Sequence, residues 1–243
     1  MGRYPNEETA EPYHTPRIIL VGCCGHSDFC FDQWNPPAFK RFDFGCGRHR
    51  GHSGWSYVDV GQGDCELIRT PDDQTILIDA GTNATGDALV HYLEKLGVTQ
   101  IDTLIATHPH EDHIGGMDEV IHAFPIGEIY LPKIADSQTP TTRTYERLLE
   151  AIDDRGLSIT PGHGGMTILD ENGIKLEFLA PNSDSYAELN SYSIVAKLTC
   201  GQKSFLFTGD AEADSEDEML DWLYNITDTL RYELYYNMPS VYD

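Results

Sequence analysis

Three imidazoles and two carboxylates stand within six consecutive residues of this chain of 243. The segment 107–113 reads Thr-His-Pro-His-Glu-Asp-His, follows a short apolar run and precedes two glycines. Imidazole nitrogen and carboxylate oxygen together suit zinc, iron or manganese. We therefore predict that this turn binds metal ions, with His108 and His110 directed to one ion and Asp112 and His113 to a neighbouring one.

A second acidic position, Asp210, lies far downstream in the sequence Thr-Gly-Asp. A carboxylate at this point can bridge two cations and complete both coordination shells. The alternative, in which Asp210 only caps the helix that follows, loses weight beside the histidine cluster. We predict that Asp210 is the ligand that the two ions share.

Both groups of ligands follow a predicted strand directly. Thr103–Ala106 leads into the histidine cluster, and Ser204–Phe207 leads into Asp210. Open α/β sheets bind their ligands at the carboxyl ends of their strands. The sequence thus predicts that two loops distant along the chain converge on the same ions.

Short β-type runs alternate with helical patterns from Trp55 onward, as in an α/β domain. We expect one such domain over residues 54–243. The remaining predicted strands are Trp55–Val60, Cys65–Arg69, Thr75–Ile78, Ile129–Leu131, Thr167–Leu169, Ile174–Leu179 and Ser193–Leu198, with Leu230–Tyr236 as a further one. The predicted helices are 86–96, Gly115–Phe124 and Thr144–Asp154.

Residues 1–53 contain several prolines and no sustained period of either 2 or 3.6 residues, so we expect an irregular, disordered leader. The run Ile18–Cys23 only faintly resembles a lipoprotein signal, because a signal needs about 7–15 apolar residues. No segment approaches the roughly 20 apolar residues of a membrane-spanning helix. The compartment, cytoplasmic or secreted to the cell envelope, and the oligomeric state stay open.

The chain is strongly acidic, with 40 Asp and Glu against 16 Lys and Arg and a formal charge of −24. Such a charge repels phosphate backbones and anionic lipids. Non-specific binding to nucleic acid is therefore not expected. A small-molecule or phosphodiester substrate, neutralised locally by metal ions, remains compatible with this charge.

The HxHxDH turn, the upstream segment Ile76–Gly81 and the downstream Thr-Gly-Asp together resemble the metallo-β-lactamase superfamily over roughly residues 55–225. Val58–Asp64, which contains the turn Gly-Gln-Gly-Asp, and Asn190–Ser193 are similar to the ComEC-like branch. That branch includes the hydrolase domain of a DNA-uptake protein.

This resemblance implies a four-layer αββα sandwich with a metal centre at one edge of the sheets. It implies that His108, His110, Asp112 and His113 are the primary ligands and that Asp210 is the bridge. Asp79 would orient the cluster from behind the ligands. Two Zn²⁺ ions are expected, with Mn²⁺ as the alternative.

The sequence departs from the family in two places. His163, in a Pro-Gly-His element, lies 47 positions before Asp210 (210 minus 163), too early for the family's additional ligand, so we expect a loop histidine. Asn190 stands in the expected place, 20 positions before Asp210, as a supporting residue. No His-His-Gly-Ser element follows Asp210. We therefore expect a chain that is incomplete at its C-terminus or a second ion with fewer protein ligands.

These features favour a metal-dependent hydrolase of phosphodiester or related ester bonds, acting through a metal-activated hydroxide steered by Asp112. A lactam or thioester hydrolase of the same fold is the nearest alternative. A catalytically impaired, metal-binding domain is an alternative of a different class. A full metal complement without turnover of bis-p-nitrophenyl phosphate would favour the metal-binding domain.

Overall fold

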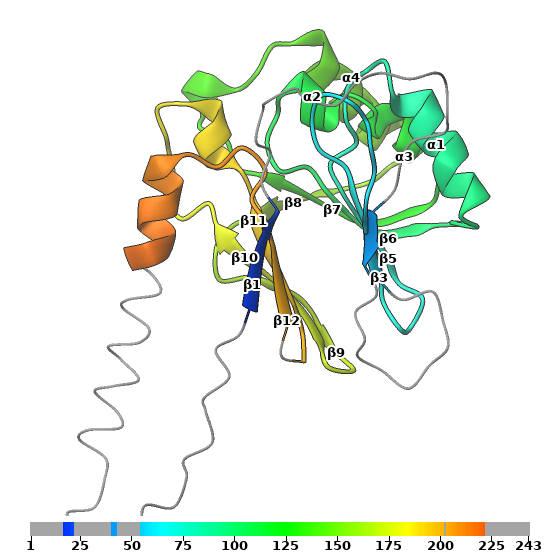
Figure 1. Ribbon diagram of the computed structural model, residues 1–243. Helices are drawn as coiled ribbons and strands as arrows, with labels where there is room; N and C mark the ends of the chain where they lie inside the picture. Colours follow the sequence, from blue (N-terminus) through cyan, green and yellow to red (C-terminus); the bar gives the residue numbers. More distant parts are fainter. Residues whose placement is uncertain (1–16, 22–39, 43–53, 202, 222–243) are drawn as a thin grey trace, which may run out of the picture.

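Two β-sheets pack face to face, and helices cover the outer face of each (Figure 1). The computed structural model describes residues 17–21, 40–42, 54–201 and 203–221. The order of layers is helices, seven-stranded sheet, five-stranded sheet and one helix. The four-layer αββα sandwich expected from the sequence is thus confirmed.

The seven-stranded sheet is antiparallel in its first half and parallel in its second. Parallel strands place their carboxyl ends at one edge, so the loops after β5, β6, β7 and β8 lie side by side. In spatial order the strands are β2 (Lys40–Phe42), β3 (Gly54–Tyr57), β4 (Glu66–Arg69), β5 (Thr75–Ile78), β6 (Ile101–Ile105), β7 (Ile126–Pro132) and β8 (Ile159–Gly162).

The five-stranded sheet is an antiparallel meander with one parallel strand added at its edge. In spatial order its strands are β1 (Arg17–Val21), β12 (Lys203–Phe207), β11 (Val195–Cys200), β10 (Ile174–Ala180) and β9 (Thr167–Glu171). The segment that joins β10 to β11 contains a short 3₁₀ helix, η2 (Leu189–Tyr192).

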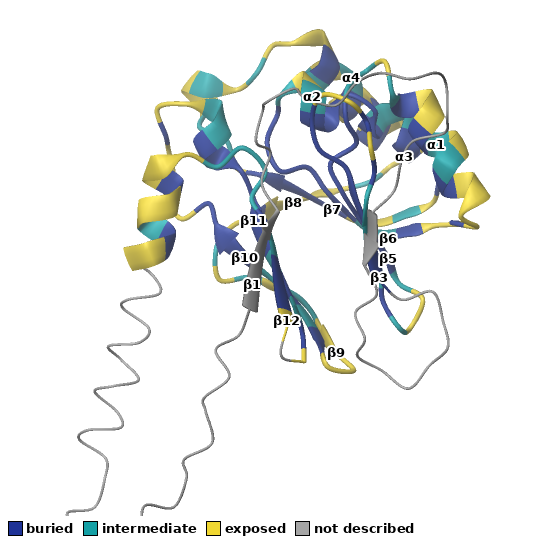
Figure 2. Cartoon of the chain, viewed as in Figure 1, coloured by how far each residue is buried: buried dark blue, intermediate teal, exposed yellow. Residues whose placement is uncertain are grey.

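The helices α1 (Gly86–Lys95), α2 (Glu111–Ile114), α3 (Met117–Ala123) and α4 (Arg143–Asp154) lie on the outer face of the seven-stranded sheet, and their exposed residues face solvent (Figure 2). A short 3₁₀ helix, η1 (Asp136–Gln138), precedes α4. The helix at 213–221 lies beside the other sheet, where Met219 packs on Leu179 and Val195. None of the described helices combines the length and apolar character needed to cross a bilayer.

The two hydrophobic cores follow from the alternation of side chains along the strands. On β5, Ile76 and Ile78 belong to the core between the sheets, whereas Leu77 belongs to the core beneath the helices. Trp55 packs edge-on against Phe205 and Phe207 of the facing sheet, with ring centroids 5.5 and 5.6 Å apart. The sheets are therefore held together by a continuous apolar layer.

Most of the predicted strands and helices are confirmed. The differences lie in segments whose structure depends on contacts with distant parts of the chain. The predicted helix Gly115–Phe124 is wrong in its start: α2 ends at Ile114, and α3 begins at Met117. Strand β8 was not predicted, because its residues carry no alternating pattern and three of the four are exposed. The predicted strand Leu230–Tyr236 lies outside the described residues.

The expectation of an irregular leader over 1–53 is corrected in two places, because β1 and β2 join the edges of the two sheets. Strand β1 pairs with β12, at the other end of the chain. Local periodicity carries no information about such a partner. The domain boundary at residue 54 itself stays a prediction.

The turn between β3 and β4 is pressed against α2. Gly63 has φ of +95°, and a Cβ built on it would lie 1.7 Å from the Asp112 carbonyl oxygen. Gly61, in the same turn, has φ of +78° but no atom within 4 Å of such a Cβ. Only Gly63 is therefore required for the close approach of the two backbones.

We expect Gly63→Ala to be clearly more destabilising than Gly61→Ala. Both variants incur the cost of a left-handed conformation, about 1–2 kcal/mol, but only Gly63→Ala must also move the backbone of α2. Urea denaturation of both variants measures the difference in the free energy of unfolding. Equal losses would show that the contact with Asp112 is absent.

Removal of a core side chain between the sheets tests the sandwich itself. Leu176 is fully buried there, and we expect Leu176→Ala to lower the free energy of unfolding by about 2–5 kcal/mol. The matched control is Leu220→Ala, because Leu220 is 60% exposed and its loss should change stability by no more than about 0.5 kcal/mol. Urea denaturation of the two variants would contradict the packing if the losses were similar.

Candidate metal centre

Asp79 is the buried point from which the predicted cluster is organised. It follows β5 in a left-handed conformation, φ of +55°, and is completely buried. Its carboxylate accepts hydrogen bonds from the Thr107 backbone N–H at 2.8 Å, the Thr107 hydroxyl at 2.6 Å and His113 Nδ1 at 2.7 Å. These bonds hold the start of the histidine turn against the end of the neighbouring strand.

The hydrogen bonds around Asp79 also fix how two imidazoles are oriented. The Thr107 hydroxyl donates to Asp79, so its oxygen is free to accept from His108 Nδ1, 3.1 Å away. His113 donates to Asp79 through its own Nδ1. In both rings the remaining nitrogen, Nε2, is thus directed away from Asp79.

Both Nε2 atoms face Asp210 from across the sandwich. His113 Nε2 lies 3.4 Å from Asp210 Oδ1, and His108 Nε2 lies 3.8 Å from Asp210 Oδ2. One ligand atom from each of the three residues lies within 4.8 Å of the other two. The predicted convergence of the two loops is therefore present in the structure.

Two backbone features bring the second sheet to this point. The Ile194 N–H, just before β11, donates to the Thr107 carbonyl at 2.9 Å. A Cβ built on Gly209, which precedes Asp210, would lie 2.9 Å from the Thr107 side chain. The loop after β12 consequently passes directly over the histidine turn.

The other two predicted ligands lie beside this group of three. His110 Nδ1 is 3.1 Å from His108 Nε2, so His110 can share an ion with His108. Asp112 is not a member of the close group, and its Oδ2 accepts a hydrogen bond from Gln62 Nε2 at 3.1 Å. The structure thus brings His108, His113 and Asp210 together, with His110 adjacent and Asp112 at the margin.

Burial and the neighbouring carboxylates shift the pKa values of these groups in opposite directions. Burial, and then the nearby His113, lower the pKa of His108 to about 3, so His108 is neutral. Burial also acts to lower the pKa of His113, but hydrogen bonds to Asp210 and Asp79 outweigh it and raise the pKa to about 11. The same hydrogen bond with His113 lowers the pKa of Asp210.

The donor set suits a divalent cation. The protonated His113 places a positive charge between two carboxylates, at the point toward which His108 Nε2 and Asp210 are directed. A metal ion can take the place of that proton and accept lone pairs from both imidazoles, since neutral imidazole and carboxylate are ligands that zinc prefers. His108, His113 and Asp210 could therefore hold a metal ion.

The two supporting positions discussed from the sequence have different surroundings. Asn190, on η2, donates to Glu212 at 3.0 Å, two residues beyond Asp210, and its buried Oδ1 has no partner among the described residues. His163 is exposed at the end of β8 and belongs to none of the close ligand groups of the described chain. Asn190 thus reaches the loop that carries Asp210, whereas His163 does not reach the three central ligands.

Three residues with contacts at this centre were not singled out from the sequence. Thr107 joins Asp79 to His108, and Gln62 holds Asp112. A carboxylate oxygen of Asp64, in the same turn as Gln62, lies within 4.8 Å of ligand atoms of Asp79 and His113. All three residues belong to motifs visible in the sequence, namely the turn Gly-Gln-Gly-Asp and the Thr before the first histidine. Their spacing alone does not indicate which ligand each of them contacts.

Comparisons with known proteins agree with the motifs. Residues 58–238 match the family described as Metallo-beta-lactamase superfamily. Over 186 residues the chain is 26% identical to ComE operon protein 3 of Bacillus subtilis, covering 70% of this chain and 23% of that protein. The chain thus spans about a quarter of the length of this relative.

Two other relatives match over shorter stretches. Hydroxyacylglutathione hydrolase 2 of Vibrio vulnificus is 31% identical over 103 residues, covering 42% of this chain and 38% of that protein. Ribonuclease J of Mycoplasma genitalium is 36% identical over 76 residues, covering 27% and 13%. Because the family match extends over most of the sequence and includes both ligand-bearing loops, this chain belongs to the metallo-beta-lactamase superfamily, whose members are metal-dependent hydrolases.

Proposed function

We propose that this chain hydrolyses phosphodiester bonds with divalent cations held by His108, His113 and Asp210, with His110 and Asp112 as additional ligands. The observation that carries the proposal is the convergence of three ligand atoms within 4.8 Å, supported by a completely buried carboxylate that orients one ring directly and the other through Thr107. A surface cluster of histidines would not have this buried support.

The bound cations and Asp210 would have distinct roles in the proposed hydrolysis. Zn²⁺ is the expected cation, two ions per chain, with Mn²⁺ as the alternative. When bound, such cations lower the pKa of a water towards about 7 and neutralise negative charge as it develops. Asp210 faces both Nε2 atoms and would be the ligand that the two ions share.

We assign the orientation of the attacking water to Asp112. Gln62 holds its Oδ2, so Oδ1 is available to accept a hydrogen bond from a water. A carboxylate in this role accepts the proton that the water loses. Gln62 would then act as a positioning residue for Asp112.

The similarity to ribonuclease J supports a phosphodiester substrate over the alternatives. His163 is exposed and lies outside the close ligand group, so it does not supply the additional Pro-Gly-His ligand, and this disfavours a lactam substrate. A second candidate is thioester hydrolysis, favoured by the similarity to a hydroxyacylglutathione hydrolase.

The purified chain should hydrolyse bis-p-nitrophenyl phosphate and lose this activity in EDTA. We expect Asp210→Asn to lower kcat/KM by at least about 100-fold, because the bridging ligand is lost. Metal content measured by mass spectrometry should fall in parallel. The matched control is Asp87→Asn, an exposed carboxylate on α1, which should leave both readouts unchanged.

Activity that survives EDTA would rule out the metal mechanism. Turnover of S-lactoylglutathione without turnover of the phosphodiester would replace the first candidate by the second. A full metal complement with neither activity would make this a binding domain.

Asp79→Asn tests the support behind the ligands. An amide has one accepting oxygen and presents N–H groups to Thr107 or to His113, so it cannot accept all three hydrogen bonds. We expect metal affinity to fall about 10–100-fold, as on loss of other outer-shell partners. Competition with a chromophoric chelator measures the affinity, and unchanged affinity in a folded variant would remove Asp79 from this role.

A further inference from the structure

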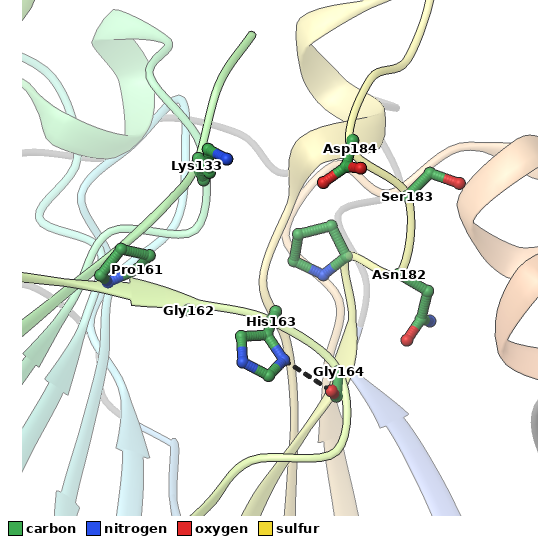
Figure 3. Close-up of a pocket in the computed structure, with 9 residues that line it drawn as sticks. Lys133, Pro161, Gly162, His163, Gly164, Asn182, Ser183 and Asp184 are labelled. Carbon is green, nitrogen blue, oxygen red and sulfur yellow. Dashed lines mark hydrogen bonds between the residues drawn. The ribbon is translucent and has the colours of Figure 1, made fainter.

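A cavity of about 240 Å³ lies where β7 and β8 end. It opens at the carboxyl edge of the parallel strands, since Lys133 follows β7 and His163 follows β8 (Figure 3). Its lining residues are Lys133, Pro161, Gly162, His163, Gly164, Pro181, Asn182, Ser183 and Asp184. The cavity thus occupies the same edge of the sheet as the loop that carries the histidine cluster.

Two contacts place this cavity next to the metal centre. Pro132 and Ile134, on either side of Lys133, line a smaller cavity together with His108. On the other side, a Cβ built on Gly162 would lie 2.5 Å from the Ile194 side chain, and the Ile194 backbone is bonded to Thr107. A ligand at the metal centre could therefore extend into this cavity.

An ammonium group and a carboxylate face each other across the opening. Figure 3 shows the side chains of Lys133 and Asp184 directed toward the same space. Neither makes an ion pair or hydrogen bond with another described residue, so both are available to a ligand. Within the described part of the chain, an unpaired cation in this position stands against a formal charge of −24 for the whole chain.

The side of the cavity formed by the segment after β8 presents further polar groups. His163 Nδ1 donates to the Gly164 carbonyl at 2.8 Å, which leaves Nε2 for a hydrogen bond with a ligand. The Asn182 amide donates to the Leu179 carbonyl at 2.7 Å. The cavity therefore offers one cation and several acceptors, which is a pattern that suits an anion joined to hydroxyl groups.

The rim on the side of Asp184 is rigidly held. The Tyr186 hydroxyl accepts the backbone N–H groups of Asn182 at 2.9 Å and Ser183 at 3.0 Å, and it donates to Glu218 at 2.5 Å. The Ser183 hydroxyl donates to Glu218 as well. Preorganised groups of this kind lose less conformational entropy when a ligand binds.

We propose that this cavity binds a phosphorylated sugar of the substrate, next to the bond that is cleaved. Lys133 binds the phosphate, and Asp184 and His163 accept hydrogen bonds from the sugar hydroxyls. The volume fits one such unit rather than a larger ligand, since cavities for drug-sized molecules begin at about 300 Å³. The assignment to the substrate rests on the proposed hydrolysis, whereas the binding itself does not.

Binding of ribose 5-phosphate and of inorganic phosphate to the full chain, followed by backbone amide NMR shifts at Gly164, Ser183 and Asp184, tests this proposal. We expect Lys133→Ala to weaken ribose 5-phosphate about tenfold, as for loss of a charged hydrogen bond. Asp184→Ala should weaken ribose 5-phosphate but not inorganic phosphate. Lys95→Ala, which removes an exposed lysine on α1, is the matched control.

Equal affinities in Lys133→Ala and Lys95→Ala would overturn the proposal, as would the absence of shifts at the three amides. An equal effect of Asp184→Ala on both ligands would overturn the assignment of the sugar. Wild-type turnover of bis-p-nitrophenyl phosphate is measured separately. If ribose 5-phosphate binds but bis-p-nitrophenyl phosphate is not hydrolysed, the sugar phosphate site stands and the proposed function is wrong. If the phosphodiester is hydrolysed but ribose 5-phosphate does not bind, the proposed function stands and the sugar phosphate site is wrong.

Discussion

The arrangement of the candidate metal centre depends on one buried carboxylate. Asp79 accepts three hydrogen bonds in an environment closed to water, and each of them constrains an atom of the histidine turn. Burial acts to raise the pKa of this carboxyl, and the three donors oppose that effect. Hydrogen bonds to a charge are also stronger away from solvent. Asp79 can therefore fix the direction of His113 directly and of His108 through Thr107.

The topology explains why such a centre forms at this edge. The parallel strands β5 to β8 end side by side, so successive loops deliver Asp79, the histidine turn, Lys133 and His163 to one border of the sheet. The facing sheet adds Asp210 from the end of β12, and the apolar layer between the sheets sets the distance between them. The proposed metal centre and the proposed sugar phosphate site are thus two parts of one edge.

Much of the fold and most of the candidate ligands could be predicted from the sequence, because the patterns that indicate them lie within short segments. The order of most strands and helices followed from apolar periodicity, and the ligand types followed from the density of histidines. The strand β1 could not be predicted, because its partner β12 lies at the other end of the chain. The hydrogen bond from Gln62 to Asp112 joins residues 50 positions apart, and spacing in a sequence cannot show which side chain meets which.

The hydrogen bond from Ile194 to Thr107 joins the two halves of the sandwich at the centre itself. His108 and His113 belong to one sheet and Asp210 to the other, so a cation shared by them would clamp the layers together. By thermodynamic linkage, any ligand that requires both halves also resists their separation. Loss of the ion would therefore make separation of the two sheets at this edge less costly, in addition to abolishing the proposed catalysis.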